Sequence, residues 1–248
     1  MKLGRTALTA LALLTGVASS IDAQSASKRG YLFGPPPATL TVFGAFAAPS
    51  AGSDLYSFSF DELTLDRGDL ATLSHGFDLA VRINPRMDAV FGLAFGRSAH
   101  RSEFRDYVDN NDQPIEQTTT LSRVPIGASL RYHPTSRGEA IGSRAWIPAR
   151  FTPWVGLGGG MMQYRFSQNG DFVDFETLDV FTSQFVAKGW TPFAQGSVGA
   201  GWSLTPALEL TGEMRYVRAS GSTGDDFQGF DRIDLSGVST SVGLTVRF

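Results

Sequence analysis

The sequence predicts an all-β fold, an eight-stranded antiparallel up-and-down transmembrane β-barrel. Apolar and polar residues alternate in eight segments, as they do in strands with one apolar face. Short and long connections alternate between these segments, and the chain ends on a strand-like segment whose last residue is Phe248. Because an even number of strands can close into a ring, no strand edge needs to face lipid.

The composition excludes several functional classes. The 248 residues include no Cys, which excludes a disulfide-stapled scaffold, a Cys-ligated zinc or iron–sulfur site and a thiol nucleophile. The formal net charge of -3 argues against a nucleic-acid partner, because such proteins usually carry a basic stripe.

Residues 1–23 have the pattern of a secretory signal peptide. Lys2 and Arg5 precede an apolar run over 7–17, and small residues follow up to a predicted cleavage site between Ala23 and Gln24. The apolar run is too short to span a bilayer as a helix. We expect residues 24–38, with three consecutive prolines, to form an extended periplasmic leader, and residues 39–248 to form the barrel.

The strand segments differ in the clarity of their alternation. It is clearest in 207–218, where apolar or small residues occupy the even positions, and weakest in 39–47. In 150–166 the glycines between Gly156 and Gly160 blur the pattern and predict a bulge or bend. The alternation also slips between Leu235 and Val238. The eight predicted strands are 39–47, 73–84, 88–100, 119–133, 150–166, 189–204, 207–218 and 232–248.

The connections fall into two classes. Tight turns are predicted at 84–88 and 205–206, whereas four other connections are long and polar. Their alternation predicts short periplasmic turns and long outer loops, with both chain ends on the short-turn side. Residues 134–149 lie on the short-turn side but are long, and the pattern offers no reason for this insertion. The long outer connections are 48–72, 101–118, 167–188 and 219–231.

The alternation also predicts which side chains face lipid. In a membrane barrel the apolar set points outward, whereas a soluble barrel would have the opposite facing. Small residues in the polar set suit a narrow lumen. Aromatic residues at the predicted strand ends suit the two membrane interfaces, and they are Phe95, Tyr132, Trp190, Trp202 and Tyr216. The residues predicted to face lipid include Leu79, Phe91, Leu93, Ile126, Leu130, Leu210, Met214, Val242 and Leu244. The predicted luminal charge network is Asp78, Arg82, Arg123, Arg131, Glu209, Glu213 and Arg215.

The end of the chain resembles known outer-membrane proteins. Val242, Leu244, Val246 and Phe248 alternate with smaller or polar residues, similar to the C-terminal signature that the barrel-assembly machinery recognises. The hairpin over 192–216 resembles that of small barrels of the OmpA, OmpX and OmpW type. The resemblance implies a bacterial outer-membrane location, that machinery as a partner, contact with lipid and lipopolysaccharide, and a monomer. Small barrels of this type differ in their roles, so the resemblance does not identify a function.

Three functions are compatible with this reading. The first is a structural or surface-interaction role, adhesin-like, with a lumen filled by the charge network. The alternative is a conduit for small hydrophobic molecules, which needs an apolar lumen near the outer rim and a lateral gap between strands. The second alternative is a lipid-modifying enzyme. We expect no cofactor, no metal site and no catalytic residues.

The enzyme hypothesis depends on one short motif. His100-Arg101-Ser102-Glu103 superficially resembles the His-x-Ser of outer-membrane lipid A deacylases. It lies at the outer end of the third strand, and the alternation along this strand assigns His100 to the lumen. A lipid-modifying site should instead face lipid. We therefore expect no enzyme.

The outer loops combine acidic and aromatic residues and are candidates for binding an extracellular ligand. Their carboxylates are also candidates for binding divalent cations, although none matches an EF-hand loop. In the first loop these residues are Asp54, Asp61, Glu62, Asp66 and Asp69 with Phe58 and Phe60, and in the third Asp171, Asp174, Glu176 and Asp179 with Phe172, Phe175 and Phe181.

Overall fold

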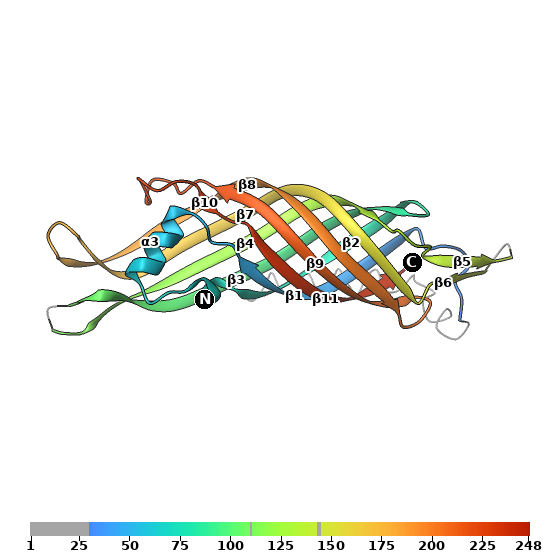
Figure 1. Ribbon diagram of the computed structural model, residues 1–248, viewed down its shortest axis with the longest axis horizontal. Coiled ribbons are helices and arrows are strands. Elements are labelled where there is room, and N and C mark those ends of the chain that lie inside the picture. The colour runs from blue at the N-terminus through green and yellow to red at the C-terminus, as the bar shows by residue number, and fades with distance from the viewer. Residues whose placement is uncertain (1–29, 110, 143–144) are drawn as a thin grey trace, which may run out of the picture.

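The computed structural model describes residues 30–109, 111–142 and 145–248, and the predicted signal peptide lies outside them. Eight long antiparallel strands form a closed ring (Figure 1). Each strand pairs with its two neighbours, and the first pairs with the last, which confirms the predicted fold class. The eight strands are β1 Ala38–Pro49, β2 Thr72–Asn84, β3 Met87–Val108, β4 Pro114–Tyr132, β7 Phe151–Val173, β8 Val180–Ser203, β9 Leu208–Gly221 and β11 Gly237–Arg247.

The pairing of β1 with β11 closes the barrel. The register runs without a shift from Thr39 opposite Arg247 to Pro49 opposite Gly237. At the end of this ladder Phe248 and Ala38 exchange two backbone hydrogen bonds of 3.1 and 3.3 Å. The C-terminus therefore lies at the end of the barrel with the short turns, and every strand edge in the ring is paired.

Four strands, β3, β4, β7 and β8, extend far into segments that the sequence predicted as loops. Segments 101–118 and 167–188, which were predicted as loops, are mostly strand, and only 109–113 and 174–179 form the tips of the two hairpins. The prediction was wrong because the polarity of the alternation inverts beyond the membrane. On β7 the outward Leu157 gives way to outward Gln163 and Arg165, while the inward positions become large and apolar.

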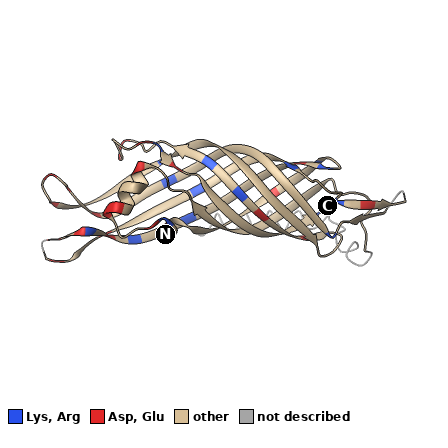
Figure 2. Ribbon diagram, viewed as in Figure 1, with Lys and Arg blue, Asp and Glu red and all other residues tan. Residues whose placement is uncertain are grey.

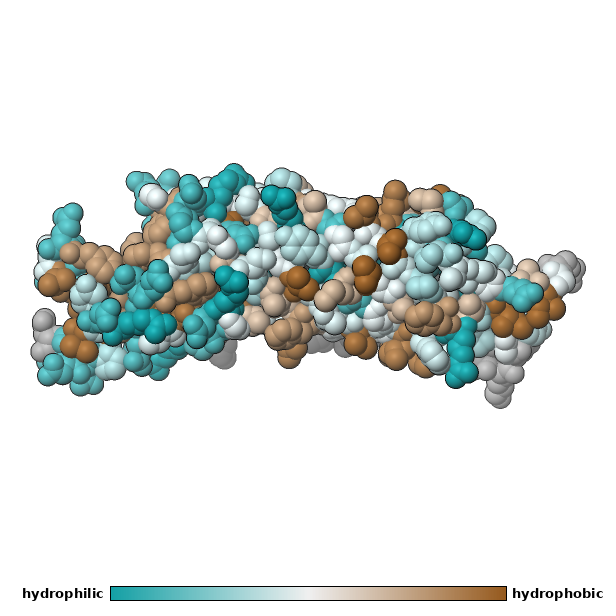
Figure 3. All heavy atoms as spheres, in the orientation of Figure 1, coloured by the Kyte–Doolittle hydropathy of each residue, from teal (hydrophilic) through white to brown (hydrophobic). Residues whose placement is uncertain are grey.

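The exterior of the barrel has an apolar belt near the short turns (Figure 3). The outward facing is confirmed for eight of the nine predicted residues, which are 37% to 61% exposed, and Leu93 is half-buried. An apolar belt on the outside of a closed barrel suits hydrocarbon and excludes the soluble alternative. The predicted interfacial aromatics, Phe95, Tyr132, Trp190, Trp202 and Tyr216, are also exposed.

The first outer connection contains two short helices that the sequence did not predict. They are α3, Asp54–Glu62, and the 3-10 helix η2, Arg67–Leu70. On α3 the side chains of Leu55, Tyr56 and Ser59 are buried, because this face of the helix is turned into the barrel. Neither helix in the described part of the chain is long and apolar enough to span a bilayer.

The long inner insertion forms a β-hairpin. Its strands are β5, Gly138–Ile141, and β6, Ala145–Pro148. Trp146 of β6 exchanges two backbone hydrogen bonds of 2.9 Å with Leu32 of the predicted leader. The insertion therefore attaches the described part of the leader at the inner end of the barrel. This contact is a structural role for residues 134–149, for which the sequence pattern offered no reason.

Two irregularities were predicted, and one of them is found. The slip in alternation near the end of the chain is a break between β10, Ile233–Asp234, and β11. At the β7 glycines a bulge or a bend was predicted; the bulge is wrong, because β7 pairs with both neighbours without a register shift, and the bend stays a prediction. The glycines instead allow a close approach of strands: a Cβ on Gly158 would overlap the carbonyl oxygen of Ala128 on β4.

Candidate functional site

Four charged side chains meet in the middle of the lumen and form what we call the central cluster. Arg215 Nη2 lies 3.0 Å from Asp78 Oδ2 and 2.7 Å from Glu213 Oε1. Arg131 Nη2 lies 3.1 Å from Glu213 Oε2 and 3.8 Å from Asp78 Oδ2. The four side chains are only 6% to 17% exposed, so their charges need one another as partners. Two acids and two arginines therefore link β2, β4 and β9 across the lumen.

A second ion pair lies nearer the inner end. Glu209 Oε2 lies 3.0 Å from Arg247 Nη2, and Thr152 Oγ1 donates to Glu209 Oε1 at 2.8 Å. Arg247 also donates to Ser203 Oγ at 2.8 Å. The alternation predicts Glu209 to face the lumen. Arg247 is absent from the predicted network, although the alternation along the last strand places its side chain inward as well.

Two predicted members of the charge network lie apart from it. Arg123 faces the lumen above the central cluster, where it donates to the carbonyl oxygen of Leu235 at 3.3 Å. Arg82 is half-buried at the inner mouth. Within the described residues neither forms an ion pair, so the predicted seven-residue network is wrong at these two positions. Strand parity gives the facing of a side chain but not its height along the barrel axis.

A third charged group at the inner mouth escaped the sequence analysis. Asp88 accepts from His133 Nε2 at 3.0 Å and from Arg137 Nη1 at 2.6 Å. Asp88 and His133 have luminal parity, so the alternation contained the signal for both. Arg137 belongs to the inner insertion, where apolar and polar residues do not alternate, so the sequence held no signal for its position. A cavity of about 50 Å³ remains among these groups, Arg82 and the leader.

Above the central cluster the lumen is closed by apolar side chains, which we call the plug. Leu55 and Tyr56 of α3 pack against inward residues of the wall, including Met162 and Phe166. The rings of Tyr56 and Phe166 meet edge to face at 5.6 Å. Burial raises the pKa of the Tyr56 hydroxyl far above its usual value, so this hydroxyl stays neutral. A cavity of about 80 Å³ separates the plug from the central cluster.

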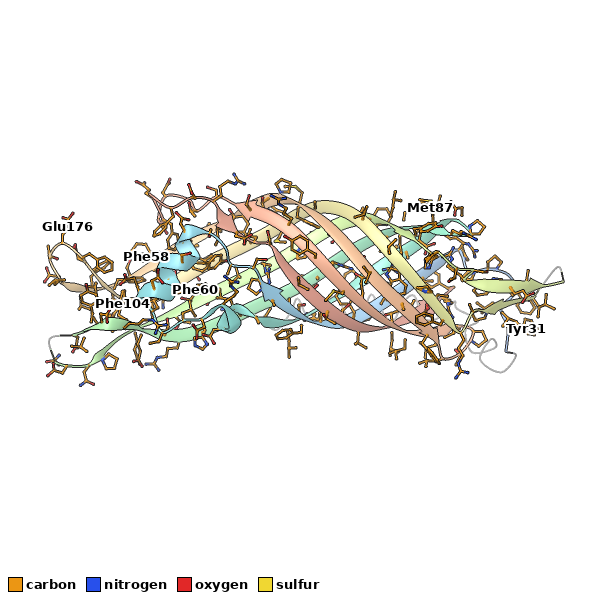
Figure 4. All side chains as sticks on the ribbon, in the orientation of Figure 1. Tyr31, Phe58, Phe60, Met87, Phe104 and Glu176 are labelled. Carbon is orange, nitrogen blue, oxygen red and sulfur yellow. The ribbon has the colours of Figure 1, made fainter. Side chains whose placement is uncertain are left out.

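A larger apolar cavity opens above the plug. It measures about 200 Å³ and lies where α3, the two long hairpins and the loop after β9 converge. Figure 4 labels Phe58 on α3 and Phe104 on β3 at this end of the barrel. Glu62, Asp226, Gln117 and Gln168 are the polar residues of its lining. We call it the outer cavity; its aromatic walls include Phe58, Phe104, Phe172, Phe185, Phe227 and Phe230.

Acidic residues gather on α3 and on the outer loops (Figure 2). Asp109 accepts backbone hydrogen bonds from Asn111 and Gln113, and these bonds lower the pKa of its carboxyl group. Across residues 30–109, 111–142 and 145–248, no group of three His, Asp or Glu is arranged to hold a metal ion. The acidic loops therefore stay candidates for contacting a partner.

Two residues of the deacylase-like motif, His100 and Ser102, face the inside of the barrel, whereas Arg101 and Glu103 are exposed. His100 Nδ1 is 3.5 Å from Asp69 Oδ1 of η2, and Ser102 is buried two positions further along β3. Ser102 Oγ has no hydrogen-bond partner among the described residues, so it is not bonded to His100. The two side chains do not form a nucleophile and base pair that faces lipid.

The predicted assembly residues occupy one outward row of β11. Val242, Leu244, Val246 and Phe248 are exposed on the apolar exterior, on the strand that closes the barrel. Their placement fits contact with lipid, and the targeting role that the resemblance implies stays a prediction.

Basic residues form an outward row just above the apolar belt. Arg97 on β3 pairs with Ser122 on β4, Ser122 with Arg165 on β7, and Arg165 with Lys188 on β8. The three cations are exposed, and within the described chain none forms an ion pair. Like charges placed directly opposite each other are destabilising, so this basic row favours an anion at the membrane boundary.

No family model and no curated protein match the sequence. Several solved structures of small outer-membrane barrels are similar. OprG from Pseudomonas aeruginosa is 14% identical, with 88% of this chain and 99% of that chain covered and a TM-score of 0.48. Neisserial surface protein A is 15% identical, with 87% and 99% covered and a TM-score of 0.44.

A third similar structure is Ail of Yersinia pestis in complex with the heparin analogue sucrose octasulfate. It is 8% identical, with 87% of this chain and all of that chain covered and a TM-score of 0.39. The assignment of the fold depends on the closed strand register and the apolar exterior of this chain itself. The chain has the fold of an eight-stranded outer-membrane β-barrel.

Proposed function

We propose that the protein is a closed barrel of the bacterial outer membrane that acts at the cell surface through its outer end. The observation that carries this proposal is the closure of the lumen at two levels. The central cluster crosses the membrane-embedded part of the lumen, and the plug crosses the part above it. Buried paired charges resist separation, so solutes have no ready path along the axis.

The wall above the membrane supports a surface role. The hairpins formed by β3 with β4 and by β7 with β8 rise beyond the apolar belt, and most of their outward side chains are polar. They carry acidic tips and exposed aromatic residues such as Phe175 and Phe181. Loops held on a rigid scaffold are where binding surfaces usually lie.

We also propose lipopolysaccharide as a partner of the basic row. Lys and Arg side chains at the headgroup level attract lipid phosphates, by about 1 kcal/mol each near a charged surface. A variant with Arg165→Glu and Lys188→Glu should lose the stabilisation that lipopolysaccharide vesicles give over phosphatidylcholine vesicles. Arg105→Glu, further out on β3, is the matched control and should keep it. Equal stabilisation of all three proteins would contradict this role.

The second candidate function is a conduit for small hydrophobic molecules. One observation favours it: the β3–β4 pairing is interrupted where Ala94 and Phe95 face Val124 and Pro125. Proline has no N–H group to donate, and Pro125 also lines the cavity below the plug. A molecule that reached this cavity would meet the place where the β3–β4 pairing is interrupted.

Uptake of 1-N-phenylnaphthylamine by cells separates the two candidates. With a closed barrel, cells expressing the protein should take up this hydrophobic dye at the rate of cells with an empty vector. Faster uptake that is lost with Pro125→Thr, which restores a backbone donor to β4, would overturn the surface proposal in favour of the conduit.

A further inference from the structure

We infer that the outer cavity binds a small organic cation, an ammonium group carried on an aromatic or aliphatic body. This site lies above the plug on the extracellular side. The inference goes beyond the proposed surface role and does not depend on whether the lumen conducts.

The walls of the outer cavity suit an apolar body. Phe172 and Phe185 meet edge to face at 4.7 Å, and Phe185 and Phe227 lie 6.0 Å apart, so the walls consist of ring faces and edges. Phe172 and Phe227 are buried although they lie beyond the membrane, which shows that this cavity has its own apolar shell. Displacing water from such a shell favours binding.

The size of the outer cavity limits the ligand to a small molecule. Its volume is about 200 Å³. An engineered apolar cavity of about 150 Å³ is known to bind benzene, so a single ring with one short polar substituent has a suitable volume. Phe58 and Phe175, whose rings meet edge to face at 6.1 Å, bound the cavity, so a larger amphiphile would have to extend beyond it into solvent.

The charges around the outer cavity select a cation. Two carboxylates, Glu62 and Asp226, contribute to the lining, and none of the described lining residues is Lys or Arg. Gln117 Oε1 is buried there without a hydrogen-bond partner in the described structure. The two carboxylates and the Gln117 oxygen accept hydrogen bonds, and phenylalanine faces attract cations. Asp226 Oδ2 already accepts from the Val186 N–H at 2.9 Å, which leaves Oδ1 for a ligand. A ligand with a positively charged hydrogen-bond donor, such as an ammonium group, therefore complements these acceptors and ring faces.

Calorimetric titration of the full chain in lipid nanodiscs tests the inference with three probes of equal size. Benzylammonium, benzyl alcohol and benzoate share the ring and differ in charge. We expect saturable binding of benzylammonium at least about tenfold tighter than that of benzyl alcohol, and no binding of benzoate. Empty nanodiscs give the baseline for partition into lipid.

Two sets of variants locate the binding. Glu62→Gln combined with Asp226→Asn should weaken benzylammonium about fivefold and leave benzyl alcohol unchanged, because the amides keep the shape. The matched control, Asp61→Asn with Asp225→Asn, removes two neighbouring carboxylates outside the lining and should change neither affinity. Val173→Trp, which fills the cavity, should abolish both.

Three results would overturn the inference. They are equal affinity for benzylammonium and benzyl alcohol, an unchanged benzylammonium affinity in the amide double variant, and an absence of saturable binding in the wild type. The melting temperature of each variant, measured in the same nanodiscs, identifies any loss of binding that comes from misfolding. If Val173→Trp misfolds, the comparison of the amide double variant with the wild type decides the test.

Discussion

Asp78 on β2 and Arg215 on β9 lie 3.0 Å apart across the lumen, although β1 and β11 separate their strands in the wall. Their contact is possible because residues around them are small: a Cβ on Gly92 would overlap Asp78 Oδ1. A bond between distant strands joins opposite parts of the wall. It therefore contributes both to the closure of the lumen and to the stability of the barrel.

Replacing Asp78 with Ala should destabilise the barrel strongly. Arg131 and Arg215 would then share Glu213 alone, and a buried charge without its partner costs about 3–5 kcal/mol of unfolding free energy. Urea unfolding in lipid vesicles measures this loss. Arg218→Ala, on the outside of β9, should change stability by less than about 0.5 kcal/mol. Similar losses in both variants would show that the central cluster has no special role.

An arginine scan along β7 should locate the membrane boundary. Leu157 is 75% exposed within the apolar belt, and Leu157→Arg should cost about 2–4 kcal/mol near the middle of the bilayer. Gln163 faces outward on the same strand but above the belt, so Gln163→Arg should cost at most about 1 kcal/mol. The unfolding free energies of the two variants provide the check. Equal costs would mean that the belt is misplaced.

Adding a methyl group at Gly158 should disturb the pairing of β4 with β7. Its Cβ would overlap the Ala128 carbonyl oxygen, and overpacking of this kind costs about 1–3 kcal/mol. Gly212 provides the control, since a Cβ there meets nothing within 4 Å. Gly212→Ala should be neutral or slightly stabilising. The folded fraction on heat-modifiable electrophoresis distinguishes the two, and equal folded fractions would be evidence against close strand packing at Gly158.

Deleting Phe248 should impair assembly more than stability. The side chain is about half exposed, and its burial at the interface contributes on the order of 1–2 kcal/mol. The deletion also removes the two backbone bonds to Ala38. We expect a much larger drop in the amount inserted in cells than in the stability of refolded protein. Trp202→Ala, which removes an aromatic at the same end, should lower both modestly. Normal insertion of the deletion variant would refute the targeting role.

The sequence was sufficient for the fold because each strand in the membrane has one apolar face. A lipid-facing set and a luminal set alternate with period two, so residues such as Leu130 and Arg131 could be assigned to opposite faces. The ring closure followed from the even number of strands and the need to pair every edge. These rules act locally and leave a clear pattern.

The candidate sites were harder to predict because they depend on contacts between distant segments. Nothing in the local sequence indicates that Tyr56 enters the barrel. Its helix is short and has no long amphipathic pattern, and it is stabilised by packing against the distant Phe166. The extension of the hairpins was missed because the alternation inverts above the membrane. Likewise, the role of Arg137 depends on its distance from Asp88, which parity does not encode.

The ionic current through the purified protein in a planar lipid bilayer tests the closed lumen most directly. Insertion is verified in the same preparation by heat-modifiable electrophoresis, and a porin reconstituted in parallel provides the positive control. Because the central cluster and the plug both cross the lumen, we predict no discrete current steps from the wild type. Reproducible steps that change in size with Asp78→Ala would contradict the account.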